Sequence, residues 1–441
     1  MRPSLKNYLV GAALMLYPVL LLTRQGAMNG CFLLLEVVAL AWLVSPAARE
    51  QRGPWDAATW AYTLAMVALI PAILMSEVVN HQLQPQPYDG AARFLAAVPV
   101  YLLLRRTPAR ILRITQYSFP AGAVASALMA WAHPTYFGLR VGSSFLDPIR
   151  LGDLSLALGF MSLLSLNGYA TDRPALRILK WLGVACALYV SAVSGSRGGW
   201  LAIPPVLLIW VLHARRSGSR RYLLPGLLAA AAVAVGSYWV VPEIHHRIND
   251  ISRNFAALKA GNPNTSVGER LMLWKVAWQL FWSHPVFGVG PDGFQQAMMP
   301  LYHAGVLTRT VAWTGTTEVH SDIIARVVRY GIFGLAAILA VYLVPLALFV
   351  RQARHGATRF MRAAAVMGLG FVVAYLVFGL TIELFDLTMN AAFYSLTVAV
   401  FLAMATHLEP GPDDAHTALP LAPTLADDLD RGRVRPTYLR W

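Results

Sequence analysis

Long apolar blocks alternate with short polar segments along the whole chain. The blocks are about 17 to 25 residues long, enough for an α-helix to cross a hydrocarbon core of roughly 30 Å. The pattern predicts about twelve spans, near residues 7–23, 27–45, 57–77, 91–104, 111–131, 151–168, 178–194, 200–214, 222–241, 321–350, 363–384 and 388–406. We therefore expect an all-α polytopic membrane protein, with nine spans in residues 1–241 and three in residues 321–406.

The composition fits this fold class. Hydrophobic residues make up 57% of the 441 positions and charged residues only 13%, whereas a soluble protein has roughly 25% charged residues. This difference excludes a soluble multidomain enzyme. The first span follows Arg2 and Lys6 as a signal peptide would, but no small-residue cleavage site comes after it, so we expect it to be retained.

The basic residues indicate how the spans are oriented. Of 36 Lys and Arg, 10 lie in one set of alternate loops, and 23 lie in the termini and the loops at 46–56, 105–113, 167–180, 213–221 and 351–362. Cytoplasmic loops are enriched in Lys and Arg, so both termini are expected in the cytoplasm. The formal net charge of +14 then reflects topology, and the expected partner is a lipid bilayer rather than nucleic acid.

One external connection is too long to be a simple linker. It covers residues 242–320, and we expect it to form a periplasmic loop that contains short helices. Ser266 and Glu269 form a capping box there and a proline ends the apolar run, which predicts a helix at about 267–284. The tail at 407–441 is rich in Pro, Asp and Arg, a composition typical of a disordered cytoplasmic segment.

Three tryptophans recur every four residues on the expected loop helix, namely Trp274, Trp278 and Trp282. They share one face, because residues four apart lie one above the other on a helix. Two interpretations stay open at this point. The helix either rests in the headgroup region of the membrane through these rings or packs against the spans through them.

Charged residues at the external ends of spans are costly and therefore mark candidate functional positions. Ser196 and Arg197 lie in a turn of small residues at 194–199, where backbone amides can approach a ligand closely. Arg197 fits an anion clamp, and snorkelling to a lipid phosphate is the alternative. Arg270 lies in the first turn of the loop helix, where free N–H groups also attract phosphate, unless it is simply exposed to solvent.

His320 lies where the long loop enters the next span. A neutral imidazole at a water-accessible helix start can accept a proton from a hydroxyl nucleophile, although a lone interfacial histidine is more often a polar cap. Asp386 follows Glu383 in a later external connection. It is placed to orient such a histidine or to bind sugar hydroxyls, with a plain turn residue as the alternative.

The sequence indicates neither metal nor nucleotide chemistry. The only D-x-D pair, Asp428 and Asp430, lies in the tail, and the long loop has no close acidic pair, so arginine would have to neutralise a phosphate. No lysine follows a glycine, which excludes a P-loop. Cys31 and Cys186 fall in expected spans and offer no disulfide framework. We expect no metal and no cofactor.

The most specific motif combines a histidine with two glycines. His320 and Ser321 are followed, after nine residues, by Gly331 and Gly334. This element resembles that of the O-antigen ligase family of Gram-negative bacteria, which is related to O-antigen polymerases and bacterial protein O-oligosaccharyltransferases. The resemblance is strongest from about residue 185 to residue 340.

Two further stretches resemble the same family. One is the small-residue turn with Arg197, and the other is the E-R-x-x-x-W stretch with Arg270 and Trp274. Position 329 departs from the pattern, because Arg329 stands where many members of the wider superfamily carry a glutamate. The division among ligase, polymerase and protein-directed transferase therefore stays open.

The resemblance implies transfer of O-antigen polysaccharide from undecaprenyl diphosphate to a sugar hydroxyl of lipid A-core, at the periplasmic face of the bacterial inner membrane. Arg197 and Arg270 would bind the diphosphate, and His320 would be the general base. The remaining expected substrate-binding residues are Ser196, Trp274 and Asp386. Direct displacement by one nucleophile would invert the anomeric centre.

A function from a different class is a transporter or flippase for lipid-linked glycans, with arginines along the path. Transport sites usually lie near the bilayer midplane. The charged residues here cluster at the external ends of the spans instead. This placement favours the transferase.

The expected topology can be tested with reporter fusions. A fusion near residue 260 should be active only as a periplasmic enzyme, because residues 242–320 are expected outside. Fusions near residues 218 and 356 should be active only as cytoplasmic enzymes. Cytoplasmic activity from the fusion near 260 would overturn the assignment of the site to the periplasm.

Overall fold

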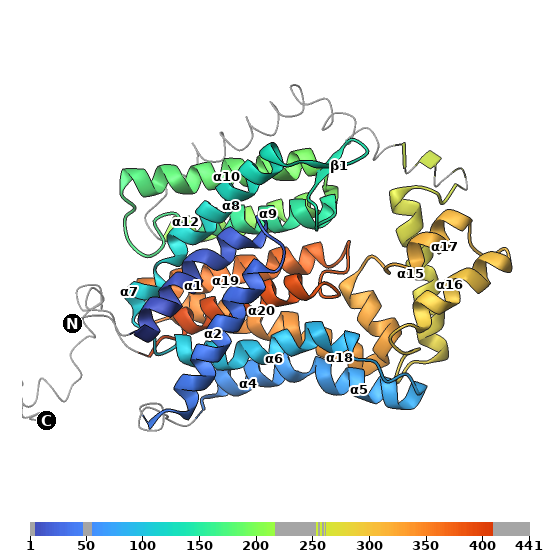
Figure 1. Cartoon of the computed structure of the whole chain (residues 1–441), viewed down its shortest axis with the longest axis horizontal. Helices are drawn as coiled ribbons and strands as arrows, with labels where there is room; N and C mark the ends of the chain where they lie inside the picture. Colours follow the sequence, from blue (N-terminus) through green and yellow to red (C-terminus); the bar gives the residue numbers. More distant parts are fainter. Residues whose placement is uncertain are drawn as a thin grey trace, which may run out of the picture.

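The computed structural model describes residues 5–46, 55–216, 253–254, 256–257, 260 and 262–408 (Figure 1). The helices are α1 (Leu5–Leu21), α2 (Ala27–Val44), α4 (Ala57–Val67), α5 (Leu69–Asn80), α6 (Gln86–Leu104), α7 (Ala109–Leu112), α8 (Thr115–Ala132), α9 (Pro148–Leu164), α10 (Pro174–Ser194), α11 (Arg197–Trp200), α12 (Ile203–Arg216), α15 (Ser266–Ser283), α16 (Gly293–His303), α17 (Arg309–Gly315), α18 (Asp322–His355), α19 (Arg359–Phe378) and α20 (Thr388–Ala405). Strands β1 (Thr135–Phe137) and β2 (Arg140–Gly142) form a short antiparallel ribbon. The expected helical architecture is confirmed apart from this ribbon.

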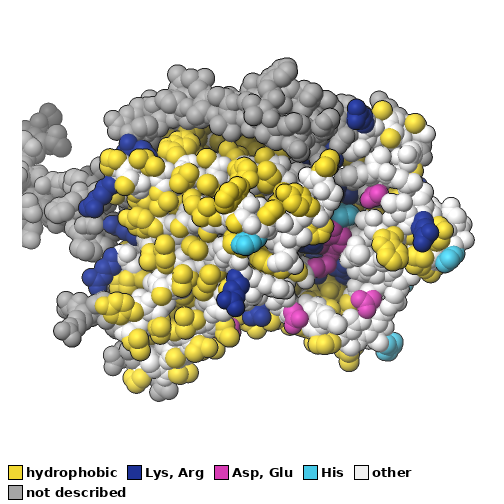
Figure 2. Space-filling model, turned by 45° about the horizontal axis from the view of Figure 1, so that its top comes forward, with side chains coloured by type: hydrophobic (Ala, Val, Ile, Leu, Met, Phe, Trp, Pro, Cys, Tyr) yellow, Lys and Arg dark blue, Asp and Glu magenta, His cyan; other side chains and the backbone are white. Residues whose placement is uncertain are grey.

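Helices occupy eleven of the twelve expected spans, and the span expected near 222–241 lies outside the described residues. Within the described part, seven segments are long and apolar enough to cross a membrane: Ala27–Val44, Ala57–Asn80, Pro174–Ser194, Arg197–Ala214, Asp322–His355, Arg359–Phe378 and Thr388–Ala405. Figure 2 shows the bundle surface covered by hydrophobic side chains. These features indicate a multi-pass membrane protein, while the total number of spans stays a prediction.

Helix α20 is the central helix of the bundle. Every residue from Met389 to Ala405 is buried, and α20 packs against α2, α6, α18 and α19. A helix that is apolar on all sides is stable only when other elements surround it. The segment before it, residues 379–387, is called here the α19–α20 connection and lies at one end of this core.

The loop helices α15, α16 and α17 form a second, smaller core at the right of Figure 1. Leu273, Phe294 and Val311 lie at its centre and are fully buried. Ala325 and Val328 from the start of α18 belong to the same core. The second core therefore extends past residue 320, where the sequence pattern put the end of the loop.

Helix α18 is broken where it passes from one core to the other. Gly331 has φ 62° and ψ −147°, which is not a helical conformation. The break leaves backbone groups without intrahelical partners, and the segment after α15 supplies them. Val289 N donates to Val328 O at 3.0 Å, and Ile332 N donates to Pro285 O at 2.9 Å. These bonds give backbone groups at the kink partners outside the helix, as a break in a membrane helix requires.

The start of α15 differs from the expectation by one residue. The predicted capping box of Ser266 and Glu269 is wrong, because the N-cap is Thr265, whose side chain accepts from Gly268 N at 3.1 Å. Glu269 instead accepts from the Thr314 hydroxyl at 3.5 Å. The helix itself, expected at about 267–284, is confirmed.

The three tryptophans of α15 do not all fit one of the two interpretations. Trp274 is half-buried and donates from Nε1 to Val319 O at 3.2 Å. Trp278 and Trp282 are 57% and 62% exposed. One end of the tryptophan face therefore packs inside the protein, and the other end lies on the surface. The predicted tail is outside the described residues, which end at 408.

Gly331→Ala tests the break in α18. A Cβ at Gly331 would lie 2.3 Å from Val286 O, and its positive φ disfavours any L side chain. We expect the free energy of unfolding in detergent to fall by about 2 kcal/mol or more. Gly30→Ala in α2 is the matched control, because a Cβ there meets nothing within 4 Å. Equal stability of both variants would show that the kink does not need glycine.

Candidate active site

The α19–α20 connection is fixed to the start of α18 by one buried carboxylate. Asp322 Oδ1 accepts from the backbone N–H groups of Leu384 and Phe385 at 3.0 and 3.1 Å. Its Oδ2 accepts from the Tyr342 hydroxyl at 3.0 Å, and its own N–H donates to Gly379 O at 2.8 Å. The fully buried Asp322, through three bonds to its carboxylate and one from its backbone N–H, holds both ends of the connection in one place.

Two arginines of α18 form ion pairs with the same connection. Arg329 Nη1 lies 2.7 Å from Glu383 Oε2 and 3.0 Å from Asp386 Oδ2. Arg326 Nη2 lies 2.8 Å from Asp386 Oδ1. Burial alone would raise the pKa of Asp386, but the two guanidinium groups hold it well below its usual range. Asp386 is therefore a carboxylate that serves as a counter-ion.

His320 forms a dyad with Glu318, two residues before it. Nδ1 of His320 lies 2.8 Å from Oε1 of Glu318, and the two side chains are 13% and 16% exposed. This contact is within ion-pair distance, and Nδ1 has no partner that meets hydrogen-bond geometry among the described residues. A carboxylate at Nδ1 favours the tautomer whose Nε2 can accept a proton. A histidine and a carboxylate placed in this way can act as a general base and its orienting acid.

Both residues of the dyad are held by neighbours. Glu318 Oε2 lies 3.1 Å from Arg150 Nη2. Burial alone would raise the pKa of Glu318, but His320 and Arg150 hold it below its usual range. Between the two residues, Val319 donates its N–H to Glu383 Oε1. These contacts keep His320 at φ 61°, a left-handed conformation that few residues other than glycine adopt.

Arg270 and the start of α11, the helix that Arg197 begins, approach the same connection. Arg270 Nε donates to Thr381 O at 3.2 Å, and its Nη1 donates to O and Oγ of Ser266 at 2.8 Å each. Arg197 begins α11, where a Cβ on the next residue, Gly198, would lie 2.5 Å from Thr381 Oγ1. Both helices thus contact Thr381.

The electrostatics of Arg270 link it to the other candidates. Burial lowers the pKa of Arg270, the carboxylate of Glu318 opposes this shift, and repulsion from Arg197 adds to it. The two guanidinium groups are therefore close enough to repel each other beside the dyad of His320. Such a pair of cations is stabilised by a bound anion such as a diphosphate.

The other three expected site residues have structural partners. Ser196 is buried and donates its hydroxyl to Asp153 Oδ1 at 2.6 Å. Trp274 binds the carbonyl of Val319, and Asp386 pairs with two arginines. The carboxylate beside the histidine is Glu318 rather than Asp386. A direct role of Ser196, Trp274 and Asp386 in substrate binding stays a prediction.

Four acidic residues that build this site are not among the site residues that the sequence predicts: Asp153, Glu318, Asp322 and Glu383. The E-x-H spacing of Glu318 and the position of Asp322 directly after the His-Ser pair are signals that were available. Within the described ranges no group of three His, Cys, Asp or Glu side chains is placed to hold a metal ion. The expected absence of a metal stays a prediction.

Figure 2 shows acidic, basic and histidine side chains gathered in a hollow between the hydrophobic bundle and the loop helices at its right. The rest of the bundle surface in this view is mainly hydrophobic. The polar hollow lies between the main core of the bundle and the second core of the loop helices. A lipid-linked substrate can approach such a place from the membrane while its polar part stays in water.

Comparisons with known proteins agree with the sequence resemblance. The chain is 24% identical over 285 residues to an uncharacterized protein of Haemophilus influenzae, a match that covers 63% of this chain and 70% of that protein. A family model described as O-antigen ligase matches residues 182–339. The matched region contains Arg197, Arg270 and His320. The resemblance is therefore confirmed for residues 182–339, which match the family model described as O-antigen ligase.

Proposed function

We propose that this protein transfers O-antigen polysaccharide from undecaprenyl diphosphate to a sugar hydroxyl of lipid A-core during lipopolysaccharide assembly. The family match supports a membrane glycosyltransferase of the ligase or polymerase type, acting on lipid-linked polysaccharide. One structural observation carries the proposal further. Arg270 and the α11 turn that carries Arg197 meet at Thr381, beside a histidine that has an orienting carboxylate.

In the proposed transfer reaction, each of these charged residues has a role in one step. His320 Nε2 takes the proton of the acceptor hydroxyl, and Glu318 stabilises the imidazolium that forms. The acceptor oxygen bonds to the anomeric carbon while the bond from that carbon to the diphosphate breaks. The electron pair leaves with undecaprenyl diphosphate, whose growing charge Arg197 and Arg270 neutralise. One displacement inverts the anomeric centre and requires neither nucleotide nor metal.

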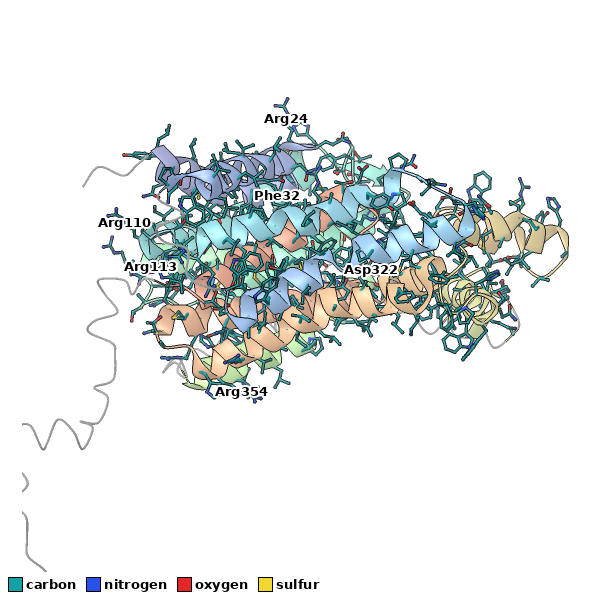
Figure 3. All side chains as sticks on the ribbon, turned by 90° about the horizontal axis from the view of Figure 1, so that it is seen from below. Arg24, Phe32, Arg110, Arg113, Asp322 and Arg354 are labelled. Carbon is teal, nitrogen blue, oxygen red and sulfur yellow. The ribbon has the colours of Figure 1, made fainter. Side chains whose placement is uncertain are left out.

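The proposed orientation places this chemistry in the periplasm, with both termini in the cytoplasm. It rests on the unequal distribution of Lys and Arg between alternate loops. Figure 3 shows Arg110, Arg113 and Arg354 toward one end of the bundle and Asp322 toward the other. In the bacterial inner membrane, the arginine-rich end would face the cytoplasm.

The acceptor decides among ligase, polymerase and protein-directed transferase. Purified protein should be given undecaprenyl-diphosphate-linked glycan together with lipid A-core, free glycan or a pilin-like protein, without nucleotide and with a chelator present. We expect glycan to appear on lipid A-core alone, because a hydroxyl of that acceptor is the proposed nucleophile. Elongation of another acceptor alone would replace the ligase assignment. Loss of transfer in chelator, restored by Mg²⁺ or Mn²⁺, would contradict the metal-free mechanism.

Substitutions separate donor binding from proton transfer. Arg197→Ala or Arg270→Ala should weaken donor binding as well as turnover, since each lost charge-assisted contact costs on the order of 2–4 kcal/mol. Lysine at either position should restore only part of the donor binding and turnover, because its ammonium group cannot form the two parallel hydrogen bonds of a guanidinium group. His320→Ala should leave donor binding nearly intact and slow turnover by roughly 10²- to 10⁴-fold.

Glu318→Gln extends this test to the orienting carboxylate. Turnover should fall by on the order of 10²-fold with donor binding unchanged, because a neutral amide stabilises the imidazolium poorly. Asp89→Asn is the matched control, because it neutralises an exposed carboxylate on α6 that takes part in none of the ion pairs of the site. If His320→Ala instead abolishes donor binding and spares turnover at saturation, the histidine is a diphosphate ligand and the base lies elsewhere.

A further inference from the structure

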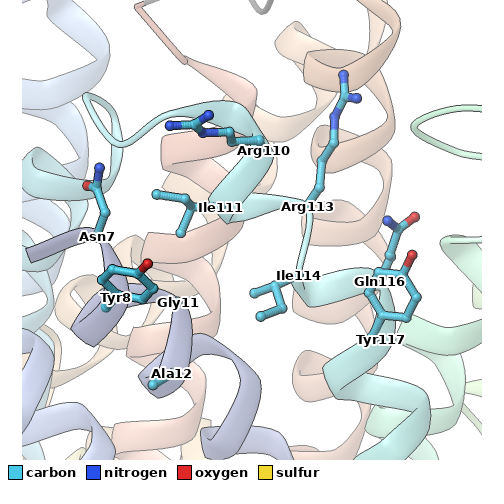
Figure 4. A pocket seen from close by; sticks show the side chains of 10 residues that line it. All are labelled: Asn7, Tyr8, Gly11, Ala12, Arg110, Ile111, Arg113, Ile114, Gln116 and Tyr117. Carbon is cyan, nitrogen blue, oxygen red and sulfur yellow. The ribbon is translucent and has the colours of Figure 1, made fainter. Parts of the chain in front are cut away.

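A cavity of about 770 Å³ lies between the start of α1 and the segment formed by α7 and the start of α8 (Figure 4). From this cavity α8 runs toward the β ribbon, where Arg140 Nε donates to Ser194 O at 2.9 Å, beside the turn of Arg197. The 18 residues of α8 span roughly 27 Å at about 1.5 Å per residue. The cavity is therefore about one helix length away from the candidate active site.

The cavity is amphipathic and basic. Figure 4 shows the polar ends of Asn7, Arg110 and Arg113 toward one side, whereas Ala12 and Ile114 lie toward the other. No acidic residue is among those that line it. An anionic group with an apolar continuation complements both sides of this cavity.

One lining residue also points to a ligand that donates a hydrogen bond. The Oδ1 atom of Asn7 is buried and has no hydrogen-bond partner among the described residues. A buried acceptor is unfavourable unless a donor reaches it. A hydroxyl group next to the anionic group of the ligand would supply that donor.

The surroundings of the cavity fit a lipid rather than a soluble anion. Tyr8 and Tyr117 line it and are 60% and 42% exposed, and tyrosine is enriched at the membrane–water interface. Along the same helices, Leu16 of α1 and Leu128 of α8 are 45% and 58% exposed. Acyl chains that leave the cavity would therefore lie against apolar side chains.

We propose that this cavity binds an anionic phospholipid with a hydroxyl-bearing headgroup, of the phosphatidylglycerol class. Arg110 and Arg113 contact the phosphodiester, Asn7 accepts from the headgroup hydroxyl, and the acyl chains run along α1 and α8. This site is independent of the proposed transfer reaction, because none of its residues belongs to the candidate active site.

Native mass spectrometry of the purified full-length protein tests the site. The protein is presented with phosphatidylglycerol and phosphatidylcholine of identical acyl chains, and retained lipid is counted. Wild-type protein should retain at least about 10-fold more phosphatidylglycerol, and Arg110→Gln/Arg113→Gln should remove this preference, since the charge-assisted contacts are lost. Arg351→Gln/Arg354→Gln is the matched control, because both arginines are exposed outside the cavity, and Arg354 lies toward the same end of the bundle (Figure 3).

Two further measurements test whether the lipid is bound in this cavity. Ile114→Trp fills the cavity without changing its charge and should also abolish the preference, and millimolar inorganic phosphate should not displace the lipid. Arg110→Gln alone, on an exposed side chain, makes the same test if the double variant does not fold. The proposal is overturned if the control pair loses the preference equally, if Ile114→Trp retains it, or if phosphate displaces the lipid.

Discussion

Two buried arginines in α18 constrain the rest of the site. Removing one partner of a buried ion pair costs on the order of 3–5 kcal/mol, so Arg326 and Arg329 must have carboxylates beside them. Glu383 and Asp386 provide these carboxylates from the α19–α20 connection, more than fifty residues later in the chain. Glu383 also accepts the N–H of Val319, immediately before His320. The position of the proposed base is thus a consequence of pairing charges inside the protein.

The backbone contacts of α18 also give a physical reason for Gly331 and Gly334, the two glycines of the motif that begins with His320. Arg329 is next to the break in α18, and its carbonyl accepts from Gly290 N at 3.1 Å and from Ser76 Oγ at 2.9 Å. Gly331 supplies the backbone conformation of the break, and a Cβ at Gly334 would lie 2.1 Å from Arg326 O. The histidine immediately precedes the N-cap of α18, and the glycines let the helix turn from the loop core into the bundle. The motif therefore specifies a backbone path as well as a reactive side chain.

The sequence predicted what depends on local pattern and missed what depends on distant contacts. Apolar blocks located eleven helices, because helix formation and membrane insertion depend on consecutive residues. The pairing of His320 with Glu318 was not predicted, since its geometry depends on the contacts of Arg150 and Glu383. Asp386 was expected to orient the histidine or to bind sugar hydroxyls, with a plain turn residue as the alternative, but the arginines that pair with it are about sixty residues away in sequence. Ser196 was expected at the ligand, and only packing shows that its hydroxyl is directed to a buried carboxylate.

The partners of the arginines separate those held in ion pairs from one that is held by neutral acceptors. Arg150, Arg326 and Arg329 each have at least one carboxylate within 3.1 Å. Arg270 instead binds only a backbone carbonyl of Thr381 and the carbonyl and hydroxyl of Ser266 in the part of the chain that the structure describes. Neutral acceptors fix the direction of a guanidinium group without cancelling its charge. In the proposed reaction, a positive charge that neutral acceptors hold in place stabilises the charge developing on the departing diphosphate, because the protein need not reorganise when the bond breaks.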